Sequence, residues 1–314
     1  MAALIHDRAT VCSGNSPAPL VFWSAEESRG PGFPGVLRPP MTGPIRRTPN
    51  NRTRAWKMKW LKTLCVVGIL QVMAMTPGHA QSELEQIKSS GAFKIGTEGT
   101  YAPFTYHDAS GALVGFDVEV GREIAKRMGV KAEFLEGKWD GLIAGLDAKR
   151  YNAVINQVGI TEARKAKYDF SQPYIASKAV LIVRGDNTTI KSFADLRGKK
   201  SAQSLTSNYA KLAETNGAQL VATEGFDQAI QLVLVGRADA TLNDNLSFLD
   251  FKKHKPDANV KVVTTQENAE HSGVLIRKGE PDLLAAINAA LDAIKADGTY
   301  QRIAETYFGQ DVSR

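Results

Sequence analysis

The sequence has few of the residues that most often build disulfides, metal sites and acid–base pairs. It holds two cysteines, Cys12 and Cys65, and both lie in the first 80 of its 314 residues. Three of its five histidines lie further on, each isolated: His107, His254 and His271. The remainder of the chain therefore offers no disulfide, thiolate nucleophile or cysteine-bound metal, and we expect no metal site, no cofactor and no catalytic histidine.

Motifs for nucleotide chemistry and hydrolysis are missing as well. The sequence has no glycine-rich phosphate loop, no G-x-S-x-G nucleophile elbow and no H-E-x-x-H zinc motif. Each of these chemistries needs its residues at a fixed spacing. The sequence therefore argues against the corresponding enzymes.

The first 80 residues differ in composition from the rest. Residues 1–57 hold eight of the 13 prolines, and such a segment buries too little apolar surface to offset its ordering entropy. We expect residues 1–57 to be disordered or to precede the true translation start. Residues 58–80 combine two lysines, a short apolar run and a Gly-His-Ala end, which is typical of a secretory signal peptide cleaved after Ala80. A buried N-terminal helix is the alternative interpretation of this run.

The net charge of +6 and the isoelectric point near 9.2 come from this front segment. It contains ten of the 39 Lys/Arg and three of the 33 Asp/Glu, so residues 81–314 carry 29 basic and 30 acidic side chains. Nucleic-acid binding depends mainly on excess positive charge. We therefore expect no nucleic-acid partner.

From residue 92 onward, short β-rich runs alternate with amphipathic helical patterns. The helical pattern of residues 116–129 places Phe116, Val120, Ile124 and Met128 on one face. This alternation predicts an α/β fold with mainly parallel sheets, whose ligands bind beyond the carboxyl ends of the strands. The predicted strands are 93–96, 132–136, 153–156, 179–183, 218–222, 240–243, 260–263 and 273–277.

Arg164 follows one of these strands in an electrostatically unfavourable position. Thr161 is a plausible N-cap, which places Arg164 in a first helical turn, where positive charge is disfavoured unless an anion compensates. A guanidinium beside free N–H groups suits a carboxylate or a phosphate. The alternative is a surface ion pair with Glu162 or Asp169, and the sequence alone does not decide between the two.

Other polar and aromatic residues also follow predicted strands. Glu98 comes just after 93–96 and Asp244 just after 240–243; Asp244 also suits the N-cap of the next helix. Trp139 precedes a helix and either stacks on a ligand or packs in the core. One cation, two carboxylates and several aromatics are the groups that a zwitterionic amino acid requires.

Long stretches of the chain resemble the periplasmic solute-binding proteins of ABC transporters for polar amino acids (family 3 type). The EGTY, NQV and SNY elements are most similar to the L-cystine-binding branch. A Thr206-Ser207-Asn208-Tyr209 turn replaces the Gly-Thr-Asn-Tyr turn usual in that branch. The stretches that carry the resemblance are EGTYAPF, GFDVEVGREIAKRMG, KWDGLIAGLDAKRYNAVINQVGIT, EARKAKYDFSQPY, KSFADLRGKK, GVLIRKG and IKADGTYQRIAETYFG.

The resemblance implies a two-lobed type II periplasmic-binding-protein fold with two hinge crossings. Each lobe is expected to be a mainly parallel sheet flanked by helices. Lobe 1 is expected to comprise 81–176 and 272–314, and lobe 2 to comprise 177–271. The ligand is expected in the cleft between the lobes.

The resemblance also implies a role for individual residues. Arg164 matches the clamp for an α-carboxylate, and Asp244 matches the acceptor for an α-ammonium group. Glu98 matches the acid that recognises the end of the ligand side chain, and Tyr101 and Trp139 match aromatic walls. The remaining positions are expected to contribute to the amino-acid head or to the lobe 2 loop beside it: Asn156, Gln157, Gly159, Ser207, Asn208 and Tyr209.

These implications define the expected function. The chain is expected to be a monomeric, non-enzymatic binding protein of the periplasm that delivers an amino acid, L-cystine first, to an inner-membrane permease. Glutamine, histidine, arginine and glutamate are the alternative ligands. A same-fold cyclohexadienyl (arogenate or prephenate) dehydratase is the alternative from another class, with Glu98 as its general acid.

Overall fold

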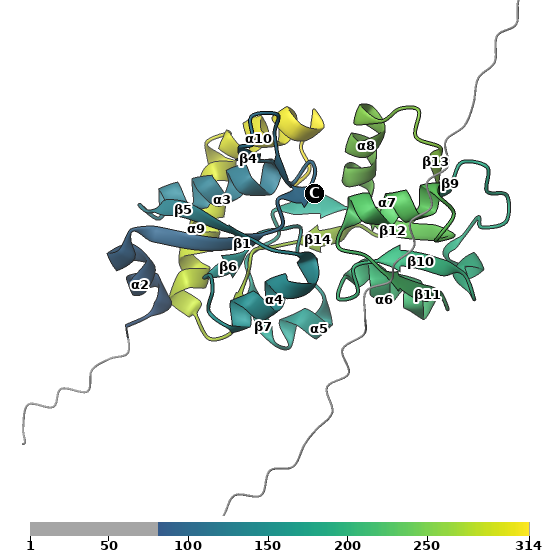
Figure 1. Ribbon diagram of the computed structural model, residues 1–314. Helices are drawn as coiled ribbons and strands as arrows, with labels where there is room; N and C mark the ends of the chain where they lie inside the picture. The colour runs from purple at the N-terminus through teal and green to yellow at the C-terminus, as the bar shows by residue number, and fades with distance from the viewer. Residues whose placement is uncertain (1–80, 314) are drawn as a thin grey trace, which may run out of the picture. The chain divides into compact units, whose positions relative to one another are not determined.

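The computed structural model describes residues 81–313 (Figure 1). The expected disordered extension and signal peptide lie outside the described residues. Among the helices of residues 81–313, none is both long and apolar enough to cross a membrane.

Two five-stranded sheets organise the described chain. We call the first sheet and its helices lobe 1, and the second sheet and its helices lobe 2. The first sheet has the order β5 (Lys131–Glu136), β1 (Ala92–Thr97), β6 (Ala153–Val154), β15 (Leu275–Arg277) and β7 (Tyr168–Phe170). The second has the order β11 (Gln219–Ala222), β10 (Lys200–Gln203), β12 (Ala240–Asp244), β9 (Ala179–Arg184) and β13 (Val260–Thr265).

Helices flank both sheets, as the alternating pattern predicts (Figure 1). Lobe 1 contains α2 (Glu83–Ser90), α3 (Phe116–Arg127), α4 (Trp139–Asp147), α5 (Glu162–Lys165), α9 (Pro281–Ala296) and α10 (Thr299–Phe308). Lobe 2 contains the 3-10 helix η1 (Phe193–Leu196), α6 (Asn208–Thr215), α7 (Phe226–Leu234) and α8 (Asn245–His254). A small sheet joins β2 (Thr100–Tyr101), β3 (Thr105–His107) and β4 (Leu113–Val114).

The prediction of mainly parallel sheets is confirmed, with one antiparallel strand in each sheet. β1 pairs parallel with β5 and β6, but β15 pairs antiparallel with β6 and β7. Likewise β10 pairs parallel with β11 and β12, but β9 pairs antiparallel with β12 and β13. β9 and β15 are the first strands after the chain changes sheet. They do not follow a βαβ crossover, which is the connection that makes neighbouring strands parallel.

The two chain crossings lie side by side. β8 (Ile175–Ser177) carries the chain from the first sheet to the second, and β14 (Glu270–Ser272) carries it back. These two strands pair antiparallel with each other, and Ile175 lies opposite Ser272. Two short crossings of this kind are the two hinge crossings of the type II fold.

Each lobe has its own apolar core. In lobe 1, the predicted face of α3 is confirmed, because Phe116, Val120 and Ile124 are fully buried and Met128 packs against them. In lobe 2, Ile182 of β9 packs with Ile230 of α7, and both are fully buried. Leu246 of α8 also packs into the lobe 1 core, and the two cores let each lobe hold its own half of a site rigidly.

Candidate functional site

A pocket opens between the carboxyl ends of strands from both lobes, where the α/β pattern predicts a ligand. It encloses about 470 Å³ of space outside protein atoms, some of it open to solvent. The lobe 1 wall is formed by Glu98, Tyr101 and Trp139. The lobe 2 wall is formed by Gln203, Ser204, Ser207, Asn208, Tyr209, Thr223, Gly225, Phe226, Ala229, Thr241 and Asn243.

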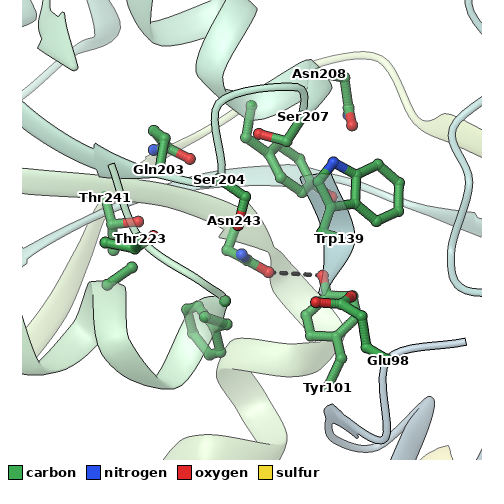
Figure 2. Close-up of a pocket in the computed structure, with 14 residues that line it drawn as sticks. Glu98, Tyr101, Trp139, Gln203, Ser204, Ser207, Asn208, Thr223, Thr241 and Asn243 are labelled. Atoms are coloured by element: carbon green, nitrogen blue, oxygen red, sulfur yellow. Dashed lines mark hydrogen bonds between the residues drawn. The ribbon is translucent and has the colours of Figure 1, made fainter. Parts of the chain in front are cut away.

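Hydrogen bonds across the pocket connect the two lobes. The Tyr101 hydroxyl donates to Oδ1 of Asn243 at 2.7 Å, as Figure 2 shows. At the rim, the Asp140 carboxylate accepts from the Thr206 backbone N–H at 2.9 Å and from the Thr206 hydroxyl at 2.8 Å. The lobes are therefore closed on each other in this structure.

Arg164 lies just outside the pocket lining, next to two residues that line it, Trp139 and Asn208, and is 9 % exposed. Its guanidinium donates to the carbonyl oxygens of Gly159, at 2.9 Å, and Thr206, at 3.3 Å. It also lies over the Trp139 ring, with its central carbon 5.3 Å from the ring centroid. Burial lowers the pKa of Arg164 from its usual value, and the nearby Glu270 carboxylate opposes that shift.

The surface ion-pair interpretation of Arg164 is wrong. Glu162 pairs with Lys165 at 2.9 Å, and Asp169 accepts from the Gly279 backbone N–H at 3.0 Å. Among the described residues, no carboxylate lies within 4.0 Å of the Arg164 guanidinium. A buried guanidinium with carbonyl partners alone retains the capacity to bind an anion.

The helix that carries Arg164 begins as predicted but is short. Thr161 is the N-cap, and its hydroxyl accepts from the Arg164 N–H at 3.3 Å. However, α5 spans only four residues, and the Arg164 N–H also reaches the Thr161 carbonyl at 3.1 Å. So short a helix contributes little dipole. Any anion affinity of this end of the pocket therefore rests on the side chain of Arg164.

Asp244 is a helix cap, as its sequence position suggested. Its Oδ1 accepts from the Leu246 N–H at 2.8 Å, which caps α8. Its Oδ2 accepts from the hydroxyls of Ser177, which precedes β9, and Tyr209, at 3.5 Å. Burial raises the pKa of Asp244 to about 6, which the hydrogen bond from Ser177 partly offsets.

Glu98 lines the pocket at the end that we call the far end, and it is 8 % exposed. The Asn156 side-chain amide donates to its Oε2 at 2.6 Å, while Oδ1 of Asn156 accepts from the Glu98 N–H at 2.8 Å. Burial raises the pKa of Glu98 to about 7, against the hydrogen bond from Asn156. Asn156 thus orients Glu98 from beneath and does not itself line the pocket.

Gln157 and Gly159 lie behind the pocket wall. Gln157 has a left-handed backbone with φ of +50°, which is costly for a residue with a Cβ. The fully buried carboxylate of Asp117 accepts from the Gln157 N–H at 2.6 Å and from its side-chain amide at 3.2 Å. Burial raises the pKa of Asp117 to about 7. These contacts hold the turn between β6 and Arg164 in one conformation.

The lobe 2 loop lies between Arg164 and the pocket. Ser207 is the N-cap of α6, and its hydroxyl oxygen accepts from the Ala210 N–H at 2.9 Å. The Asn208 side-chain amide lies 3.6 Å from the position that a Cβ on Gly159 would occupy, and Arg164 lies 3.5 Å from the same position. Asn208 also donates to Glu270 at 2.5 Å. The side chains of Asn208 and Arg164 therefore lie close to each other.

The structure brings six of the eleven expected site residues to the pocket: Glu98, Tyr101, Trp139, Ser207, Asn208 and Tyr209. Trp139 both packs in a core cluster and lines the pocket, so its two interpretations are compatible. Arg164 and Gly159 adjoin the pocket through Asn208, whereas Asp244 reaches it through Tyr209.

Sequence reasoning missed several residues of the site. Gln203 ends a strand that the sequence analysis did not identify, and Thr223 and Gly225 precede a predicted helix without any charged or aromatic signal. Glu270 approaches Arg164 from the second hinge strand. A polar residue at each strand end, regardless of charge, is the signal that would have found Gln203 and Thr223. Within the described residues, no group of three or more His, Cys, Asp or Glu could hold a metal ion.

With the fold and the pocket described, the class of protein is clear. Residues 93–310 match the family of bacterial extracellular solute-binding proteins, family 3. The chain belongs to this family. Its two lobes, two hinge strands and inter-lobe pocket are the type II periplasmic-binding-protein fold.

Proteins similar to this chain include L-cystine-binding and arginine-binding members. The L-cystine-binding protein TcyA of Bacillus subtilis (strain 168) is 47 % identical over 229 residues, which cover 73 % of this chain and 85 % of that protein. The crystal structure of the L-cystine solute receptor of Neisseria gonorrhoeae, unliganded and open, is 47 % identical and covers 74 % of this chain and 98 % of its own, with a TM-score of 0.50. An ancestral arginine-binding protein bound to arginine is 40 % identical and covers 70 % of this chain and 99 % of its own, with a TM-score of 0.66.

The order of the two TM-scores is the opposite of the order of the two sequence identities. The open receptor is more similar in sequence, but the ligand-bound protein is more similar in structure. The inter-lobe hydrogen bonds of Tyr101 and Asp140 agree with this difference. The lobes of this chain are therefore arranged more like those of the arginine-bound protein than like those of the open, unliganded receptor.

Proposed function

We propose that this chain is the periplasmic substrate-binding component of an ABC importer and that it binds a polar amino acid, L-cystine, between its lobes. The observation that carries this proposal is Arg164, a buried guanidinium that adjoins the inter-lobe pocket and has no carboxylate partner among the described residues. The L-cystine-binding names of relatives at this identity support the choice of ligand.

Each end of the pocket receives one part of the ligand in this proposal. The α-carboxylate binds Arg164 and displaces the carbonyls that now accept from it, with Ser207 and Asn208 donating from lobe 2. The α-ammonium group binds near Asp244, Gln157 and Gly159. Tyr101, Trp139 and Tyr209 exclude water, while Glu98, oriented by Asn156, accepts from an ammonium group at the far end.

The boundaries of the parts are also proposed. Lobe 1 comprises 81–176 and 272–314, and lobe 2 comprises 177–271. Residues 58–80 are a signal peptide cleaved after Ala80, and the processed protein is a monomer that contacts the inner-membrane permease when its lobes close. Mass spectrometry of the exported protein tests the cleavage, because a first residue other than Gln81 contradicts it.

Titration calorimetry of the purified protein, after removal of co-purifying ligand, tests the function. We expect L-cystine to bind more tightly than glutamine, histidine, arginine or glutamate. A cystine dissociation constant weaker than about 100 μM, roughly −5.5 kcal/mol, contradicts the cystine assignment. Tight binding of one of the other four amino acids keeps the transporter role and replaces the ligand.

A further inference from the structure

Helix α7 begins at the pocket without a cap. Its N-cap residue is Gly225, no side chain caps it, and the N–H groups of Phe226 and Asp227 have no acceptor among the described residues. Gly225 and Phe226 both line the pocket. A helix N-terminus combines free N–H donors with partial positive charge, and both favour an anion.

Thr223 adds a second, independent donor at the same place. It lines the pocket (Figure 2). It is 5 % exposed, and its buried hydroxyl oxygen has no hydrogen-bond partner among the described residues. The neighbouring Thr241 differs, because its hydroxyl donates to the Ala202 carbonyl at 2.8 Å. A buried hydroxyl without a partner is costly, so a ligand acceptor at Thr223 satisfies a group that the protein leaves unpaired.

The opposite wall supplies a negative group. Oε1 of Glu98 lies 3.9 Å from the position that a Cβ on Gly225 would occupy. Among the residues that the structure describes, no lysine or arginine lines the pocket, and the nearby Lys138 and Glu224 pair with each other. The far end of the pocket therefore offers one acceptor for a cation and several uncharged donors for an anion, side by side.

We propose that Thr223 and the N-terminus of α7 bind a second carboxylate of the ligand. The inference rests on the proposed function, which places the first carboxylate at Arg164. With Glu98 accepting from the second ammonium group, both ends of the pocket bind amino-acid heads. A ligand with one head at each end, such as a disulfide-linked pair of cysteines, fits this arrangement, whereas arginine or glutamine offers no anion to α7.

Two probes isolate the second carboxylate. One is L-cystine, and the other is the mixed disulfide of L-cysteine with cysteamine, which lacks that carboxylate and keeps the second ammonium group. By calorimetry, we expect the wild-type protein to bind cystine about tenfold more tightly than the mixed disulfide, because hydrogen bonds to a charged group are lost.

Thr223→Val keeps the shape of the side chain and removes its hydroxyl. We expect this variant to bind cystine about tenfold more weakly and the mixed disulfide as tightly as the wild type does. Thr241→Val is the matched control. It removes a hydroxyl that already has a partner, so any effect should be by the same factor for both ligands.

Gly225→Ser tests the helix terminus. The added Cβ meets only Glu98 Oε1, at an ordinary contact distance of 3.9 Å, and the φ of 165° is extended backbone that serine adopts. The serine hydroxyl would cap α7 and occupy its free N–H groups. We expect the melting temperature to be kept or raised, cystine affinity to fall and affinity for the mixed disulfide to stay unchanged.

The outcomes separate this inference from the proposed function. If the wild-type protein binds neither disulfide, the cystine assignment fails, and the inference fails with it. If it binds both equally, the second carboxylate site is overturned while the proposed function stands. An equal loss for both ligands in Thr223→Val, or no loss for either, also overturns the site.

Discussion

The two ends of the pocket differ in how their polar groups are satisfied. At the near end, Arg164 donates to two backbone carbonyls and Asp244 accepts from a helix N–H and two hydroxyls. At the far end, the Thr223 hydroxyl and the first N–H groups of α7 have no partner within residues 81–313. One end is held in place by the protein, and the other leaves its donors unpaired.

This difference suggests how general binding and specificity are divided. A prearranged near end costs little to organise for the head that every amino acid shares. At the far end, a ligand that supplies the missing acceptor binds more tightly than one that does not, because buried donors left unpaired are costly. Specificity is therefore expected to depend on the far end, and affinity mainly on the near end.

The largest expected effect is at the near end. Arg164→Ala removes the buried guanidinium that adjoins the pocket, so we expect cystine affinity to fall about 100-fold or more, roughly 3 kcal/mol. Arg164→Lys should lose most of this affinity too, because an ammonium group cannot pair with a carboxylate in the bidentate geometry. Calorimetry measures both variants, and circular dichroism checks that the fold is intact.

Lys165→Ala is the control for this experiment. Lys165 is the next cation along the chain, and it is exposed and paired with Glu162. We expect its removal to leave cystine affinity unchanged. Near-native affinity in Arg164→Ala would contradict the α-carboxylate role and remove the near end from the comparison.

An intermediate effect is expected at Glu98. Glu98→Gln keeps an acceptor for Asn156 but removes the negative charge, so cystine affinity should fall about tenfold at pH 8. Because burial raises the pKa of Glu98 to about 7, wild-type affinity should rise as pH increases from 6 to 8. Glu98→Gln should flatten this rise. Asp244, whose pKa burial raises to about 6, Asp117, at about 7, and Glu270, whose pKa burial also raises, contribute to any slope that remains.

The stability of the ligand-free protein should change with pH in the opposite direction. A carboxyl whose pKa is raised on folding binds more protons when folded, so its contribution is present at low pH and is lost as pH rises through about 7. Glu98→Gln should therefore be more stable than the wild type at pH 8 and closer to it at pH 5. Equal melting temperature differences at both pH values would contradict the raised pKa.

Much of this architecture could be predicted from the sequence, because strand runs and amphipathic helices are local signals. The buried face of α3 and the cap residues Thr161 and Asp244 are of this kind. The antiparallel pairing of β9 and β15 was missed, since it depends on where the chain re-enters each sheet after crossing between lobes. Such long-range pairing has no local pattern.

The site could be predicted only where a residue type was unusual for its position. Arg164 and Glu98 could be predicted because each is a charged residue that follows a strand. Thr223 and Gly225 could not be predicted, because their importance depends on a missing partner and a missing cap, which only the fold reveals. Glu270 was also missed, because only the fold shows that the second hinge strand brings it close to Arg164.

The smallest expected effect concerns the contact that joins the two walls of the pocket. Tyr101→Phe removes the hydroxyl that donates to Asn243 at 2.7 Å and keeps the ring, which packs 5.1 Å from Phe104. A net hydrogen bond of about 1 kcal/mol corresponds to roughly a fivefold loss of cystine affinity. X-ray scattering of the ligand-free variant should give a larger radius of gyration than the wild type, because the lobes close less often.

Tyr106→Phe is the control, since the Tyr106 hydroxyl has no hydrogen-bond partner among the described residues. Equal changes in the two variants would mean that the Tyr101 hydroxyl does not hold the walls together, and that closure depends on Asp140 and Thr206 at the rim.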